Sequence, residues 1–242
     1  SQSISISSPM SQQNPYNAVI TVIFDDDSTA DYSQFLSGTS GFNSSLSTGG
    51  KSIKAVSASS SSGGTTIYGI KIDGRLLVNT GLWDVSQNWS SYSTGPFESL
   101  RPSSAAFDGR TDTWAQPTAG ETVKFNFTGF GDGTAFRIFA AKGSGGETYI
   151  KVNGVNITSQ VSTSAGWVSP TGTGSGLSSI ELISVSGVGT GQLFAVEVNG
   201  AFLVNSGEQY NTSQTWSEMY TGTAGGGDAN IFNAFDGNPN TK

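Results

Sequence analysis

An internal repeat constrains this chain more than any other feature of its sequence. The segment Ile67–Gly81 (IYGIKIDGRLLVNTG) has a counterpart at Leu193–Gly207 (LFAVEVNGAFLVNSG), 126 residues later. Three further pairs keep nearly the same spacing: Trp89-Ser90 with Trp216-Ser217, Ala106–Gly109 with Ala234–Gly237, and Ser52–Lys54 with Ser179–Glu181. Because the blocks stay in order with only small shifts, the chain is built on a repeat of about 127 residues, the size of a small domain.

The phase of this repeat predicts three segments. Residues 1–78 form a partial or divergent first unit, residues 79–203 form one complete unit, and residues 204–242 begin a third. Half a β-sandwich can neither bury its inner face nor pair its strand edges. Two interpretations stay open: the chain is a segment of a longer array, or another chain completes its end.

The local patterns predict an all-β protein. The chain has 33 glycines among 242 residues and lacks a periodic segment long enough to form a stable helix. Short runs rich in β-branched and aromatic residues recur instead, at residues 19–24, 123–127, 136–140, 148–152, 179–185 and 193–198. Asn153-Gly154 lies between two such runs and predicts a tight hairpin, because these residues tolerate the positive φ of a type I′ turn. Short strands with Gly, Ser and Thr connectors are typical of antiparallel sandwiches or barrels.

Alternation along these strands predicts the core of the complete unit. In a strand, only every second side chain points inward. For residues 193–198 we expect Phe194, Val196 and Val198 to point inward, which puts Glu197 outside or on the loop-facing edge. The full set of candidates is Val123, Phe125, Phe127, Phe136, Ile138, Ile150, Val152, Ile180, Leu182, Phe194, Val196 and Val198.

Composition excludes several function classes. Without His or Cys, the chain cannot form disulfides, thiolate or imidazole zinc sites, or Ser-His-Asp and Cys-His catalytic groups. With 11 basic and 18 acidic residues its net charge is −7, which disfavours a nucleic-acid partner. No apolar run reaches 18 residues, so no membrane insertion is predicted. No acidic pair has the context of a glycosidase site, and we predict that the protein is not an enzyme.

One segment resembles a known domain family. Ala106–Gln116 (AFDGRTDTWAQ) is similar to the opening motif of discoidin-type, or galactose-binding-like, domains, and Leu193–Gly200 is similar to their closing strand. The resemblance covers residues 103–200. It implies an antiparallel jelly-roll β-sandwich for each tandem unit.

The whole repeat resembles units found in large structural proteins of aquatic tailed phages. The resemblance implies a non-enzymatic structural protein of a phage virion appendage, such as a fibre, spike or decoration, or of a similar extracellular fibre. The alternative is a carbohydrate-binding adhesin module on a cell surface or secreted protein. Either function implies an extracellular or virion location.

Four oxygen-bearing side chains are candidates for a calcium site. Asp108, Asp112 and Thr113 lie on one glycine-containing loop, and calcium binds carboxylate, hydroxyl and carbonyl oxygens. The discoidin-type resemblance implies that Glu197, on the closing strand, completes the set. The alternative is an Asx turn in which Asp108 accepts hydrogen bonds from its own loop.

The five tryptophans divide into two groups. Trp89 and Trp216 occupy the same repeat position, which favours a structural role, and Trp83 lies in the linker before Trp89. We assign these three to assembly of the array. Trp114 and Trp167 do not recur, and they are the candidates for stacking on glycans.

The beginning of the chain is a candidate for strand addition between units or chains. Ser1–Ser8 (SQSISISS) alternates polar and apolar residues, so Ile4 and Ile6 lie on one face of a predicted edge strand. Exposed edges recruit strands from neighbours. We therefore expect self-association into an oligomer or fibre, and the alternative is a disordered terminus.

Overall fold

The computed structural model describes residues 2–8, 19–37, 41–60, 66–143, 147–186, 190–206, 210–219 and 234–236. The protein is all-β, with 41% of residues in strands and 11% in helical turns, as the sequence predicts. The helical residues named as elements lie in five short 3-10 turns: η1 (Ser33–Phe35), η2 (Trp89–Tyr92), η3 (Ser103–Ala106), η4 (Thr158–Gln160) and η5 (Trp216–Met219). The described residues contain no α-helix, and no helix among them could cross a membrane.

The chain folds into two compact units. Unit 2 is the continuous segment Gly81–Gly207, close to the complete unit predicted at residues 79–203. Unit 1 combines Ser1–Thr80 with Glu208–Lys242. The sequence predicts that residues 204–242 begin a third unit, whereas the structure groups Glu208–Lys242 with the beginning of the chain. Hydrogen bonds from Asn79 and Thr80 to the end of the chain join the two parts of unit 1.

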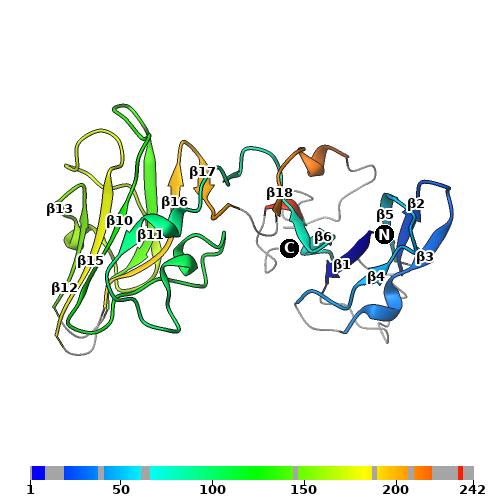
Figure 1. Cartoon of the computed structure of the whole chain (residues 1–242), viewed down its shortest axis with the longest axis horizontal. Helices are drawn as coiled ribbons and strands as arrows, with labels where there is room; N and C mark the ends of the chain where they lie inside the picture. The colour runs from blue at the N-terminus through cyan, green and yellow to red at the C-terminus, as the bar shows by residue number, and fades with distance from the viewer. Residues whose placement is uncertain are drawn as a thin grey trace. The chain divides into compact units, whose positions relative to one another are not determined.

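Unit 2 contains two five-stranded sheets (Figure 1). The first is antiparallel, in the order β13 (Val155–Asn156), β12 (Glu147–Val152), β15 (Ser179–Ser186), β10 (Thr122–Asn126) and β9 (Ser93–Thr94). The second has the order β14 (Gly166–Val168), β11 (Phe136–Ala141), β16 (Gln192–Val198), β17 (Ala201–Leu203) and β8 (Trp83–Asp84). Its last pair, β17 and β8, is parallel.

The predicted Asn-Gly hairpin joins β12 to β13. Asn153 and Gly154 both have positive φ, 51° and 80°, and Val152 pairs with Val155. The Asn153 side chain also bonds a neighbouring loop: its amide donates to the carbonyl oxygens of Thr173 and Gly176. The hairpin therefore anchors the loop that precedes β15.

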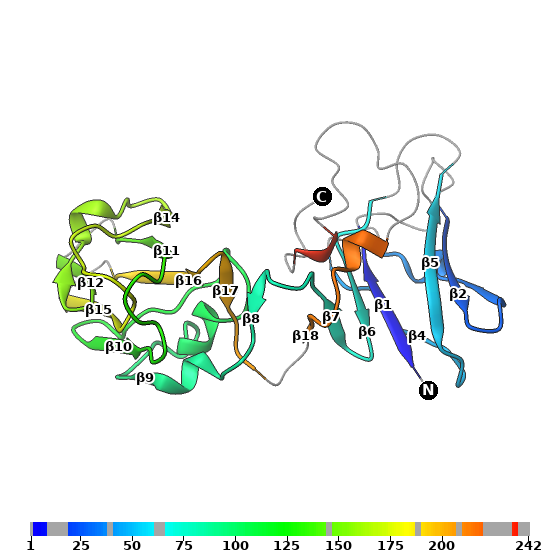
Figure 2. The same ribbon diagram turned by 90° about the horizontal axis from the view of Figure 1, so that it is seen from above.

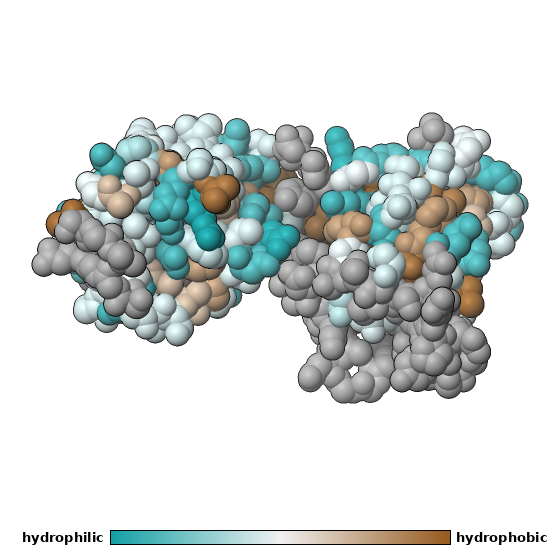
Figure 3. Space-filling model, turned by 90° about the horizontal axis from the view of Figure 1, so that it is seen from below, coloured by the Kyte–Doolittle hydropathy of each residue, from teal (hydrophilic) through white to brown (hydrophobic). Residues whose placement is uncertain are grey.

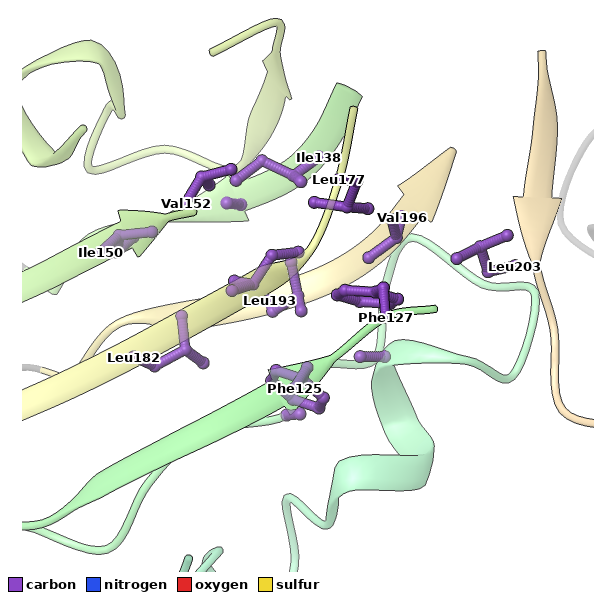
Figure 4. Close-up of a cluster of buried hydrophobic side chains, with 14 of the residues drawn as sticks. Phe125, Phe127, Ile138, Ile150, Val152, Leu177, Leu182, Leu193, Val196 and Leu203 are labelled. Atoms are coloured by element: carbon purple, nitrogen blue, oxygen red, sulfur yellow. The ribbon is translucent and has the colours of Figure 1, made fainter. Parts of the chain in front are cut away.

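The core of unit 2 contains most of the predicted residues (Figure 4). Two differ: Phe136 is only partly buried, and Phe194 is buried but lies outside the core cluster. The cause of the second difference is an irregularity in the pairing of β11 with β16, where Phe139 pairs with Ala195 but Ala140 pairs with Leu193. This β-bulge adds one residue and changes the alternation, so Leu193 takes the core position expected for Phe194.

Unit 1 has a larger and a smaller sheet (Figure 2). The larger has the order β18 (Tyr210–Asn211), β7 (Arg75–Leu77), β6 (Gly69–Ile72), β1 (Ser3–Ser7) and β4 (Leu46–Ser47). The smaller has the order β3 (Thr29–Asp31), β2 (Val19–Phe24) and β5 (Ile53–Ser59). The buried cluster of unit 1 includes Ile4, Ile6, Ile20, Val22, Phe24, Tyr32 and, from the distant end of the chain, Ala234 and Phe235.

The surface is mixed in polarity. On the face shown in Figure 3, the apolar residues of unit 2 lie in small separate areas among polar ones. Single exposed apolar side chains of this kind are normal for a folded domain.

Candidate functional site

One set of contacts closes each unit and involves residues far apart in the chain. We call this set the clasp. It joins a closing segment, residues 201–206 in unit 2 and 75–80 in unit 1, to an opening segment. The opening segment is residues 83–107 in unit 2, and residues 210–219 with 234–235 in unit 1.

The clasp of unit 2 centres on Asn205. The backbone N–H of Asn205 donates to the carbonyl oxygen of Phe107 at 2.9 Å, and its side-chain Oδ1 accepts from the N–H of Ser90 at 2.9 Å. Ser206 N–H donates to the carbonyl oxygen of Gln87 at 2.8 Å. One residue thus binds two parts of the opening segment, which lie 17 positions apart in the sequence, at 90 and 107.

The clasp of unit 1 repeats these contacts at Asn79. Asn79 N–H donates to the carbonyl oxygen of Phe235 at 2.9 Å, and Asn79 Oδ1 accepts from Ser217 N–H at 3.0 Å. Thr80 N–H donates to the carbonyl oxygen of Gln214 at 3.1 Å. Each atom pair matches its counterpart in unit 2 at a spacing of 126–128 residues.

Strand pairing repeats in the same way. In unit 2 the parallel pair β17–β8 places Phe202 opposite Trp83, and in unit 1 the parallel pair β18–β7 places Tyr210 opposite Leu76. In unit 1 the Asn79 amide also donates to Ser217 Oγ at 3.0 Å, and both side chains are buried. Since a buried polar group without a partner is costly, Asn79 holds its opening segment in a defined register.

Sequence reasoning did not identify Asn79 and Asn205 as clasp residues. Both lie in the repeated block, in the sequences VNTG and VNSG, and the repeated Trp-Ser dipeptide contains their serine partners. The sequence did contain a signal for them: in both copies of the repeat, a polar Asn follows the corresponding run of apolar residues. The sequence alone did not show which distant segment it would bind.

The assembly candidates lie inside the units. Trp89 belongs to the core of unit 2, where its ring stacks on Phe130 at a centroid distance of 5.4 Å. Trp216 packs against the core cluster of unit 1, and Trp83 is buried in β8. The recurring pair therefore packs within its own units.

Ile4 and Ile6 are fully buried within unit 1. Their strand, β1, pairs on one side with β4 and on the other with β6. The structure therefore differs from the expected edge strand: β1 is an interior strand of its own unit.

Trp114 and Trp167 belong to one aromatic stripe on the second sheet of unit 2. Ring centroids link Trp114 to Phe194 at 5.3 Å, Phe194 to Phe139 at 5.6 Å, and Phe139 to Trp167 at 5.2 Å. Trp167 also contacts Phe202 at 5.4 Å. Because Ile138 and Ala140 face the core, the stripe lies on the opposite face of the sheet.

Two arginines cover the tryptophan rings of this stripe. The Arg101 guanidinium lies 3.3 Å from the centre of the Trp114 ring, and that of Arg137 lies 4.2 Å from the Trp167 ring. Such cation–π contacts stabilise each ring in place. The alternation in FRIFA, which places Arg137 and Phe139 on one face, was the signal that could have revealed the stripe.

The four calcium candidates are held by other partners in the structure. Asp108 accepts from Arg110 N–H at 3.0 Å and from Thr113 Oγ1 at 2.6 Å, which is the Asx-turn alternative. Asp112 is paired with the Arg110 side chain at 2.8 and 2.6 Å. Among the described residues, no group of three or more acidic side chains is placed to hold a metal ion.

The remaining candidate, Glu197, lies on the sheet rather than on this loop. Arg137 donates to its two carboxylate oxygens at 2.8 and 2.6 Å from the neighbouring strand. Alternation correctly placed Glu197 outside the core. On the loop that contains Asp108 and Asp112, the two carboxyl groups shift in opposite directions. Burial raises the pKa of Asp108, whereas hydrogen bonds from Arg110 lower the pKa of Asp112.

No protein-family profile, curated protein or solved structure matches the chain. Two arrangements in the structure bear on function, the clasp and the aromatic stripe.

Proposed function

We propose that the chain is a non-enzymatic structural protein, part of a phage virion appendage or a similar extracellular fibre. On this proposal it consists of tandem jelly-roll units of the discoidin type. The observation that carries it is the recurrence of the clasp, with equivalent hydrogen bonds around Asn79 and Asn205. A contact set conserved between units of one chain is expected where the units must stack as equivalent building blocks.

The strand order supports this proposal. The sheet β14-β11-β16-β17-β8 of unit 2 and the sheet β4-β1-β6-β7-β18 of unit 1 both end in a parallel pair that includes the opening segment. The repeat spacing also relates β15 to β5 and β16 to β6. These correspondences support a common plan for the two units.

Localisation tests the proposal directly. Antibodies raised against Gly81–Gly207 should label an appendage of purified virions, or surface filaments, in immunogold electron microscopy of the source. The open reading frame should contain further copies of the 127-residue repeat. Labelling confined to soluble material, together with an adjoining catalytic domain, would contradict a structural function.

The alternative function is carbohydrate binding by an adhesin module, and the aromatic stripe is the observation that favours it. Trp114 and Trp167 are half-buried on one sheet face, and aromatic rings present apolar surface to sugars. The arginine contacts already occupy part of these rings. Intramolecular packing therefore competes with glycan stacking.

A glycan array distinguishes the two functions. On the adhesin alternative the chain binds a defined glycan class, and Trp167→Ala abolishes that binding. Tyr92→Ala is the matched control, since Tyr92 is an exposed aromatic that the stripe does not include. An array without hits for the unmodified chain would exclude the glycans tested and leave the structural proposal as the better one.

A further inference from the structure

The clasp of unit 1 joins segments that are separated by the whole of unit 2. Asn79 and Ser217 are 138 residues apart, and Thr80 and Thr212 are 132 apart. In unit 2 the corresponding serine and asparagine, Ser90 and Asn205, belong to one continuous segment of chain. Unit 1 is therefore assembled from two separate pieces of chain, and its opening piece follows unit 2.

Recognition in the clasp depends mainly on groups that every copy of the chain presents. Three backbone N–H donors, the carbonyl oxygens of Phe235 and Gln214, and the Asn79 side chain make the contacts. The Ala234-Phe235 pair adds apolar burial, because both residues pack into the cluster that contains Ile4 and Ile6. The opening segment of any other copy carries the same groups in the same order.

We propose that the closing segment of unit 1 is a docking surface for the opening segment of a second copy of this chain. Copies would then join head to tail, each donating its opening segment, residues 210–219 with 234–235, to the next. A heterologous contact of this kind generates a ring or an open filament. The proposal rests on the proposed structural function and identifies the partner and the contact through which the fibre would grow.

Concentration decides between closure within one chain and exchange between chains. A segment that belongs to the same chain as its binding surface has an effective concentration on the order of 1 mM. Exchange therefore competes when the protein itself approaches about 1 mM during folding, or when copies are held side by side in a fibre. At micromolar concentration the segment should stay in its own chain.

Two single-cysteine variants test the exchange. Thr80→Cys and Gln214→Cys place thiols at neighbouring exposed positions of the clasp, in a chain that has no cysteine of its own. The two variants are mixed, unfolded and refolded together at about 1 mM, then treated with a short bismaleimide. We expect a covalent species of twice the 25.0 kDa chain mass, in an amount that rises with the concentration during refolding.

The equivalent pair in unit 2 is the matched control. Gln87→Cys and Ser206→Cys occupy the corresponding positions of a clasp whose two segments belong to one continuous unit. We expect this mixture to give only the background of random cross-linking. Equal yields from the two mixtures would overturn the proposal.

The double variant Thr80→Cys, Gln214→Cys in one chain separates the other outcomes. Internal cross-linking of this chain, with no hetero-dimer from the mixture at any concentration, would show that the clasp closes only within a chain and would overturn the proposal. Absence of both products would show that the clasp does not form, with the same consequence. Neither result would affect immunogold labelling of an appendage, so failure of this proposal and failure of the structural function are distinguishable.

Discussion

Replacing Asn79 with Ala should selectively destabilise unit 1. The Asn79 side chain makes two hydrogen bonds of 3.0 Å with Ser217, and both residues are at least 95% buried. In Asn79→Ala the Ser217 Oγ loses the amide that donates to it, and the Ser217 backbone N–H loses its acceptor. An unsatisfied buried group of this kind costs about 1–3 kcal/mol, so we expect a loss of about 2 kcal/mol in the free energy of unfolding.

Differential scanning calorimetry measures this loss. For a unit of just over 100 residues, 1 kcal/mol corresponds to about 4 °C, so the transition of unit 1 should fall by about 8 °C. The transition of unit 2 should stay unchanged, because the hydrogen bonds of Asn79 with Phe235 and Ser217 lie within unit 1. Asn205→Ala is the matched variant: it removes the acceptor for Ser90 N–H and should lower the other transition.

A second variant separates the hydrogen bonds from simple loss of volume. Asn79→Leu keeps about the same side-chain volume and loses both hydrogen bonds with Ser217, so its transition should also lie below that of the unmodified chain. If Asn79→Ala shifts no transition by more than about 1 °C, the clasp does not hold unit 1 together. A shift of the transition that Asn205→Ala also lowers would show that the assignment to unit 1 is wrong.

Three further predictions concern the loop that contains Asp108. Gly109→Ala should destabilise unit 2 by about 1–3 kcal/mol, because Gly109 has φ +77° and an added Cβ would lie 2.4 Å from the Trp83 ring. Urea unfolding measures this loss, and an unchanged midpoint would contradict the prediction. Burial raises the pKa of Asp108 above its ordinary value of 3.8, so the folded state binds the proton more tightly and the Asp108 contribution to stability falls as pH rises from about 3.8 through the raised pKa. Asp108→Asn should remove this fall from its own stability–pH curve, so the difference in stability between the unmodified chain and the variant should change over this pH range, and parallel curves would contradict the prediction. Finally, since Asp112 and Glu197 are already paired with arginines, exchanging calcium for a chelator should move the transition of unit 2 by less than about 1 °C; a larger rise with calcium would restore these residues as a metal site.

Local patterns in the sequence determined the strands and most of the core of unit 2. Asn153-Gly154 forms its hairpin because only residues that tolerate positive φ can occupy both positions. Val123 and Phe125 face the core because alternation along a paired strand allows no other arrangement once one face is buried. These properties depend on neighbours in the chain, and they can therefore be predicted from it.

The bulge opposite Phe139 and Ala140 could not be predicted in the same way. It depends on how two strands more than 50 residues apart fit together, and it moves Phe194 from the core to the aromatic stripe. The arginine partners of Glu197 and Asp112 could not be predicted from the sequence for a similar reason. Arg137 reaches Glu197 only across a strand pair, and Arg110 reaches Asp112 only because the loop turns back on itself.

The repeat likewise determined that the end of the chain is an opening segment, but not which closing segment it binds. Its sequence shows the Trp-Ser and Ala-Phe-Asp-Gly blocks of an opening segment, and these are equally suited to any unit of this plan. Only the tertiary structure pairs Ser217 with Asn79. The physical reason is that the clasp consists of backbone groups and one repeated asparagine, so the choice of partner depends on which closing segment is within reach.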